Sequence, residues 1–198
     1  MLSSIIETEE PGQRLNLDRR DIVKMGLGTL VASVLPLFPV RSAFAYGYDK
    51  YKSWKISFRH AHTGESFSGV YRVGDKYLPE AFERMNYVLR DFRTAEVFPM
   101  DPRVIDILSL LYDRVDATES YQVLSGYRSP KTNAMLRSGS SGVARNSFHM
   151  YGQAIDIRIP GQNTKTVRNT ALDLRAGGVG YYPRSNFVHV DTGKVRSW

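Results

Sequence analysis

Two short segments of this 198-residue chain carry histidine and carboxylate side chains at spacings that suit metal chemistry. In the first segment, His149 precedes Asp156 by seven residues, and Asp156 lies among isoleucines, where an unpaired carboxylate would be costly to bury. In the second segment, His189 and Asp191 are two residues apart, so both side chains point to one face of a strand. If the two strands are neighbours, an imidazole and a carboxylate from each converge on one point.

The chain contains no cysteine, so any metal must be held by nitrogen and oxygen ligands. Three such protein ligands with one open position have the composition of a catalytic zinc site, which activates water near neutral pH. Manganese and iron also suit such ligands. The alternative is that Asp156 pairs with Arg158 or Arg128 and that each histidine is an ordinary core residue. The residue types alone leave both interpretations open.

Strands and helices must bring these residues together. Alternating apolar and polar side chains predict strands over residues 55–62, 66–73, 121–124, 154–159, 178–182 and 187–191. Apolar residues at helical spacing predict helices that begin at Pro79 and at Pro102, and a third over 164–176 that ends at Gly177 in a left-handed turn. No repeat or linker interrupts residues 46–198. We therefore expect one domain of class α+β, with helices packed on a mainly antiparallel sheet.

Residues 1–45 have the pattern of an export signal. Arg19 and Arg20 precede an apolar stretch over residues 25–40, and Ala43-Phe44-Ala45 provides a small-x-small cleavage pattern. This combination is typical of a twin-arginine signal. The apolar stretch is short and interrupted by prolines, which disfavours the alternative of a membrane-spanning helix. We expect export to the periplasm or cell envelope, with membrane contact only if the signal segment is retained.

The basic charge belongs to the predicted working domain. The chain has 27 basic and 20 acidic residues, a net charge of +7, and residues 1–45 hold five of each sign. A positive domain suits an anionic partner such as an acidic wall polymer, acidic lipid or nucleic acid. Nucleic acid is not expected as a partner, because export removes it and no recognition motif occurs. The sequence does not determine the oligomeric state.

Several motifs resemble one peptidase superfamily. The segment Ser147 to Asp156 is similar to the S-x-H-x-x-G-x-A-x-D signature of zinc D-Ala-D-Ala carboxypeptidases and murein endopeptidases, which share the hedgehog/D-Ala-D-Ala peptidase-like fold. The segments 125–129 and 187–191 resemble the upstream arginine motif and the downstream ligand strand of this superfamily. Further segments resemble its twin-arginine-exported murein endopeptidase branch, namely 62–65, 90–93, 177–183 and the ending 196–198. The resemblance covers residues 50–198 in order.

The resemblance implies roles for individual residues. It implies that His149, Asp156 and His189 hold Zn²⁺ and that Arg128 stabilises the substrate carbonyl or its oxyanion, where negative charge develops. Ser147 is expected beside the substrate backbone. The remaining residues that we expect to bind substrate are Tyr127, Gln153 and Tyr182.

The general base is a departure from the superfamily pattern. Many members carry a carboxylate three residues before the last metal ligand, whereas this chain has Asn186, which cannot accept a proton at neutral pH. Asp191 is the nearest candidate, either as the catalytic base or as a residue that orients an imidazole. His60 and His62 share a face of the first predicted strand and could form a second metal pair, although a structural hairpin is the alternative.

These observations predict a zinc-dependent hydrolase that cuts amide bonds in the stem peptides or cross-links of peptidoglycan. The resemblance to the exported branch implies a murein endopeptidase rather than a D-Ala-D-Ala carboxypeptidase. The alternative is a non-catalytic module, with or without zinc, that binds the cell wall. Asn186 favours this alternative, whereas the complete ligand triad and Arg128 oppose it.

Overall fold

A computed structural model describes residues 52–140 and 142–198, so the predicted signal segment lies outside the described residues. The described part forms one α+β domain, as predicted. No helix in this part is long and apolar enough to cross a membrane.

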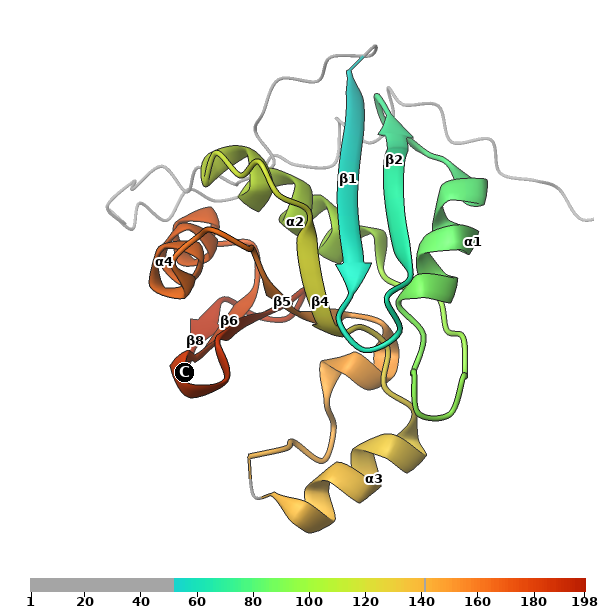
Figure 1. Ribbon diagram of the computed structural model, residues 1–198, viewed down its shortest axis with the longest axis vertical. Helices are drawn as coiled ribbons and strands as arrows, with labels where there is room; N and C mark the ends of the chain where they lie inside the picture. Colours follow the sequence, from blue (N-terminus) through green and yellow to red (C-terminus); the bar gives the residue numbers. More distant parts are fainter. Residues whose placement is uncertain (1–51, 141) are drawn as a thin grey trace, which may run out of the picture. The chain divides into compact units, whose positions relative to one another are not determined.

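An eight-stranded sheet runs through the domain in the order β3-β2-β1-β4-β5-β7-β6-β8 (Figure 1). The β1–β4 and β6–β8 pairs are parallel and the other pairs are antiparallel, which confirms the mainly antiparallel prediction. The strands are β1 (Ser53–His60), β2 (Ser66–Val73), β3 (Lys76–Tyr77), β4 (Tyr121–Ser125), β5 (Ala154–Arg158), β6 (Gly178–Tyr182), β7 (Phe187–Asp191) and β8 (Arg196–Ser197).

Within the described residues, four α-helices accompany the sheet, and three of them begin with proline, whose fixed φ suits a first helical turn. They are α1 (Pro79–Val88), α2 (Pro102–Arg114), α3 (Pro130–Gly139) and α4 (Thr164–Leu174). The side chains of Asp101, Ser129 and Asn163 cap α2, α3 and α4 by accepting a hydrogen bond from a free backbone N–H. Each capping residue also fixes where the preceding loop enters its helix.

The hydrophobic core lies on the face of the sheet that α2 and α4 cover, while α1 packs on β2 (Figure 1). Ile155 and Ile157 of β5 and Val188 of β7 are fully buried there. Strand alternation then directs Asp156 and His189 to the opposite face. Burial of the apolar rows therefore fixes which side of the sheet receives the polar site.

The structure corrects two sequence-based boundaries and adds one helix. The first strand ends at His60, so His62 lies in the following turn. The two histidines therefore do not share a strand face. Helix α4 ends at Leu174, and the left-handed residue that follows is Arg175 rather than Gly177. Glycine at 177 is needed for another reason, because a Cβ there would lie 1.8 Å from the backbone oxygen of Asp191. Helix α3 was not predicted.

Candidate metal centre

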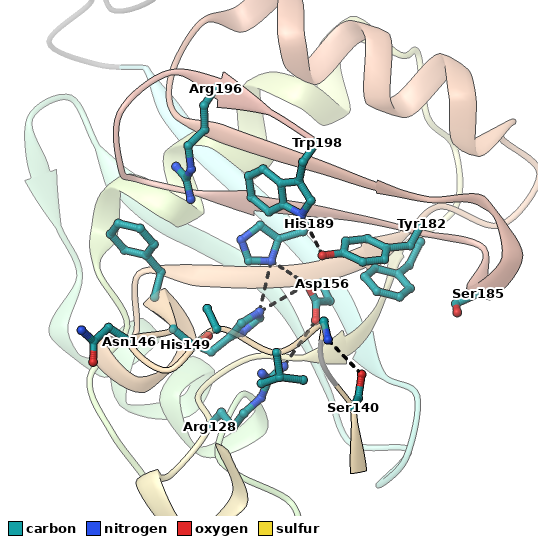
Figure 2. Close-up of a pocket in the computed structure, with 16 residues that line it drawn as sticks. Arg128, Ser140, Asn146, His149, Asp156, Tyr182, Ser185, His189, Arg196 and Trp198 are labelled. Carbon is teal, nitrogen blue, oxygen red and sulfur yellow. Dashed lines mark hydrogen bonds and ion pairs between the residues drawn. The ribbon is translucent and has the colours of Figure 1, made fainter. Parts of the chain in front are cut away.

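His149, Asp156 and His189 meet at one point on the polar face of the sheet (Figure 2). Asp156 and His189 are direct cross-strand partners in β5 and β7, and His189 Nδ1 lies 2.8 Å from Asp156 Oδ1. His149 comes from η2 (Phe148–Tyr151), a short 3-10 helix that precedes β5. Its Nε2 lies 3.2 Å from His189 Nδ1 and 3.3 Å from Asp156 Oδ1. The structure thus brings the three predicted ligands together.

A glycine turn sets the approach of η2 to β5. Gly152 has φ +63°, and a Cβ at this position would lie 2.2 Å from the backbone oxygen of Pro99. Both the left-handed conformation and the close approach require glycine. Gly152 therefore allows His149 to turn back toward Asp156 within seven residues.

Each imidazole has a hydrogen bond on the ring nitrogen that faces away from the centre, and this bond defines which nitrogen points to the centre. His149 Nδ1 lies 2.8 Å from the backbone oxygen of Gly126, which can only accept, so Nδ1 carries the proton and Nε2 is a free acceptor. His189 Nε2 lies 3.1 Å from Asp191 Oδ2, so a neutral His189 directs its Nδ1 lone pair at the centre. Such bonds to the distal nitrogen are typical of metal-ligating histidines.

The donor set fits zinc. Two imidazole nitrogens and one carboxylate oxygen, all acceptors, lie within 4.8 Å of one another, and these acceptors need a cation or proton between them. Two nitrogens, one oxygen and an open position match a catalytic zinc site. No other group of three or more such residues occurs within residues 52–140 and 142–198. The part of the chain that the structure describes therefore offers one candidate metal centre.

The pKa values of all three candidate ligands are shifted by burial and by contact with one another. Complete burial lowers the pKa of His149, which keeps this ligand neutral. Burial alone would raise the pKa of Asp156, but the adjacent His149 and His189 hold it well below its usual range. Burial opposes protonation of His189, but its hydrogen bonds to Asp156 and Asp191 raise its pKa to about 9. A metal ion at this centre would take the place of the proton on His189.

Arg128 approaches the centre from the loop between β4 and α3. Its Nη2 lies 3.7 Å from Asp156 Oδ2, whereas Arg158, the other predicted partner, donates to Gln122 instead. The other Arg128 contacts are weak, at 3.5 Å to Asn133 and Ser125, and its buried Nε has no partner within residues 52–140 and 142–198. Burial lowers the pKa of this guanidinium, which nevertheless stays charged. The Nη groups of Arg128 therefore make only long contacts within the protein.

A cavity of about 410 Å³ opens over the three ligands (Figure 2). Arg128, Ser147 and Tyr182 line it, which is the position expected for residues that contact a substrate. Tyr127 does not line it, because its ring stacks on Phe98 and its hydroxyl donates to Glu96. The prediction that Tyr127 binds substrate is not supported by this placement.

Gln153 is also absent from the lining of the cavity. Its backbone nitrogen donates to Phe148 and its backbone oxygen accepts from Thr192, so its main chain links η2 to the segment after β7. This placement indicates a structural role rather than the predicted contact with substrate.

Asp191 lies behind His189 and outside the cavity lining. It is fully buried, and its two oxygens accept from His189, Arg196 and the backbone of Gly178 and Gly193. This geometry favours the orienting role of Asp191 over the role of catalytic base.

Asn186 is exposed and accepts a hydrogen bond from Thr164. Among the described residues that line the cavity, the only carboxylate is Asp156. The cavity thus offers no carboxylate besides the proposed ligand to act as a base.

Trp198 and Arg196 line the cavity, although neither was assigned a role in the site from the sequence. Trp198 lies 5.3 Å from the His189 ring, and its indole N–H donates to the Tyr182 hydroxyl over 2.8 Å. Arg196 forms a two-pronged ion pair with Asp191. The alternating positions of Arg196 and Trp198 were the available signal, since residues two apart share a strand face.

His60 and His62 do not form a second metal pair with any nearby acid in the described residues. His60 Nδ1 accepts from the backbone nitrogens of His62 and Thr63, and the His62 ring stacks on Phe92 at 4.2 Å. Glu65, the nearest acid in sequence, is paired with Arg90. The structural interpretation of this hairpin is therefore the better one.

Comparison with known proteins agrees with the motifs. A peptidase M15 family described as peptidoglycan L,D-endopeptidase MepK matches residues 49–198. Peptidoglycan L,D-endopeptidase MepK of Escherichia coli (strain K12) is 39% identical over 185 residues, which cover 93% of this chain and 99% of that protein. The probable peptidoglycan L,D-endopeptidase MepK of Haemophilus influenzae is 44% identical over 144 residues, covering 72% of this chain and 77% of that protein. The chain therefore belongs to the peptidoglycan L,D-endopeptidase MepK family of M15 peptidases.

Proposed function

We propose that this chain is a zinc-dependent peptidoglycan L,D-endopeptidase. The observation that carries the proposal is the convergence of His149 Nε2, His189 Nδ1 and an Asp156 oxygen beneath a cavity, in a chain of this family. These three residues would hold Zn²⁺, which supplies activated water and polarises the scissile carbonyl. The relatives' names support peptidoglycan as the substrate and an L,D bond as the target.

The chain's own residues prepare this chemistry. Arg128 lines the cavity and its Nη groups make only long contacts within the protein, so its guanidinium can stabilise negative charge on the carbonyl oxygen of the substrate. Tyr182 has its hydroxyl oriented by the Trp198 indole, which leaves the phenolic proton free to donate to a bound peptide. Ser147 lies beside His149 at the cavity wall. Asp191 holds the His189 ring in the orientation that directs Nδ1 at the centre.

The location follows from the substrate. Peptidoglycan lies outside the cytoplasmic membrane, and the twin-arginine pattern of residues 1–45 supports export to the periplasm or cell envelope. The positive charge of the remaining chain suits a polymer with carboxylate-bearing stem peptides.

Digestion of cross-linked peptidoglycan tests the activity. The full chain would be incubated with zinc, with a chelator, and as His189→Ala, and the released muropeptides identified by mass. We expect loss of cross-linked species that requires both zinc and His189, with cleavage at an L,D bond. Release of terminal D-alanine alone would indicate a carboxypeptidase.

A wall-binding module is the second candidate, favoured by Asn186 and by the cavity lining, in which Asp156 is the only carboxylate among the described residues. Folded, zinc-loaded protein that sediments with peptidoglycan and releases no product would establish it.

A further inference from the structure

An ion pair lies directly behind the candidate metal centre. Arg196 Nη1 and Nη2 donate to Asp191 Oδ1 and Oδ2 over 3.0 and 2.6 Å, in the two-pronged geometry that gives strong charge-assisted bonds. Asp191 Oδ2 also accepts from His189 Nε2. A continuous chain of contacts therefore runs from Arg196 through Asp191 to the candidate ligand His189.

The sheet leaves room for this ion pair through a glycine. Gly178 is the cross-strand partner of Asp191 on one side and of Arg196 on the other. A Cβ at Gly178 would lie 2.2 Å from Arg196 Nη1 and 2.6 Å from Asp191 Oδ2. Its absence allows the guanidinium to lie over the backbone of β6 and reach the carboxylate. The position of the pair is thus built into the strand register.

Aromatic rings hold the guanidinium in place. Arg196 lies 5.2 Å from the ring centre of Phe148 and 4.8 Å from that of Trp198, distances at which a guanidinium is attracted to a ring face. Phe148 precedes His149, and Trp198 lies over His189. Arg196 therefore contacts residues next to two of the three candidate ligands, although it contacts no ligand itself.

We propose that Arg196 is a positioning residue for the metal centre, acting through Asp191 on His189. The inference rests on the proposed zinc site. Without Arg196, the Asp191 carboxylate keeps the backbone donors of Gly178 and Gly193 on Oδ1 but loses the arginine that holds Oδ2 in line with His189. The hydrogen bond from His189 Nε2 to Asp191 then fixes the tautomer and orientation of the ring less firmly, and zinc binds more weakly.

Zinc affinity of the full chain, measured by competition with a chromogenic chelator, tests the inference. Changes in residues that hold a metal ligand from behind typically cost about 10- to 100-fold in affinity. Arg196 acts on His189 through Asp191, one contact further out, so we expect Arg196→Met to weaken zinc binding by about tenfold, at the lower end of this range. Arg196→Lys, which keeps the charge but not the fork, should weaken it less. Because Arg196 acts through Asp191, Arg196→Met should cause no further loss in an Asp191→Asn background.

A matched control separates positioning from stability. Arg72 pairs with the buried Asp106, and neither residue lines the cavity. Arg72→Met should lower the melting temperature and leave zinc affinity unchanged. If Arg196→Met does not fold, the Arg196→Lys variant decides the result. Wild-type zinc affinity in Arg196→Lys would then overturn the inference.

Two further results are decisive. Wild-type affinity in folded Arg196→Met, or equal losses from Arg196→Met with and without Asp191→Asn, would overturn the positioning role. Failure of the wild-type chain to bind zinc would overturn the proposed function and this inference together.

Discussion

Replacing Arg128 with methionine should separate activity from stability. Among the residues that the structure describes, the guanidinium has no carboxylate closer than 3.7 Å and its buried Nε has no partner. Its side-chain hydrogen bonds are at the 3.5 Å limit. Such a cation contributes little to folding, because the attraction barely offsets its desolvation. The Arg128 side chain instead lines the cavity. The wild-type geometry thus suits charge stabilisation during the reaction better than it suits the resting fold.

The two effects have different magnitudes. Removal of one donor to a developing oxyanion typically costs about 10²- to 10³-fold in kcat, or about 3–4 kcal/mol. Removing one partner of a buried ion pair is destabilising when the other charge is left unpaired. In the zinc-loaded protein the zinc ion and the histidines would still compensate Asp156, and Arg128 lies 3.7 Å from it, so we expect the free energy of unfolding to change by less than about 1 kcal/mol. Arg128→Met should therefore be nearly inactive and about as stable as the wild type.

The assay compares initial rates on an isolated cross-linked muropeptide with thermal melting of the zinc-loaded protein. Arg128→Lys should retain part of kcat, because it keeps the charge but not the planar fork. Arg168→Met in α4, which removes a positive charge from a residue that does not line the cavity, should leave kcat unchanged. Activity within tenfold of wild type in Arg128→Met, or a loss of activity that parallels a loss of stability, would refute the reasoning.

Three other perturbations have defined outcomes. Burial lowers the pKa of His60 to about 4. As the pH falls below about 6.5, this histidine is therefore protonated in the unfolded chain before it is protonated in the folded one. The free energy of unfolding should decline by up to about 3 kcal/mol between about pH 6.5 and about pH 4. His60→Asn, which keeps an acceptor, should flatten this decline in pH-dependent melting curves. Gly177→Ala should destabilise the fold by about 3 kcal/mol in urea, because the new Cβ meets the Asp191 backbone, whereas Gly139→Ala in α3 meets nothing and should be neutral. The Trp54→Phe variant keeps Trp198 as its single tryptophan. Zinc should change the fluorescence emission of Trp198, because its ring centre lies 5.3 Å from that of His189. Unchanged emission at saturating zinc would contradict the proposed ligand set.

The sequence predicted the convergence of the three candidate ligands for a physical reason. A carboxylate such as Asp156, placed among isoleucines of a strand, requires a compensating cation wherever that strand is buried. The structure places Arg128 and two histidines around it and places Arg158 elsewhere. Strand alternation was enough to put His189 and Asp191 on one face. Strand alternation did not reveal that Asp191 faces Nε2 of His189, because this contact depends on the orientation of the ring.

The tyrosines show where sequence reasoning could not choose. Tyr127 and Tyr182 are both aromatic residues near glycines or the predicted arginine, and both were expected to contact substrate. Tyr127 is buried against Phe98, whereas Tyr182 is held at the cavity by Trp198, a residue 16 positions later. The difference arises from a contact between β6 and the end of the chain after β8. Helix α3 escaped prediction because its apolar residues are few, and only Thr132 and Asn133 are buried.

Register between strands is what converts these local patterns into a site. Asp156, His189 and Gly180 lie opposite one another across β5, β7 and β6, and Ala154, Asp191 and Gly178 form the next row on the same face. Each row combines a polar residue of β7 with a glycine of β6, and the space above the two glycines is filled by the side chains of Trp198 and Arg196. A slip of one residue would turn His189 and Asp191 into the apolar core and expose the valines between them. Burial of those valines therefore stabilises the same register that aligns His189 with Asp156, so the energy that folds the sheet also holds the candidate metal ligands in place.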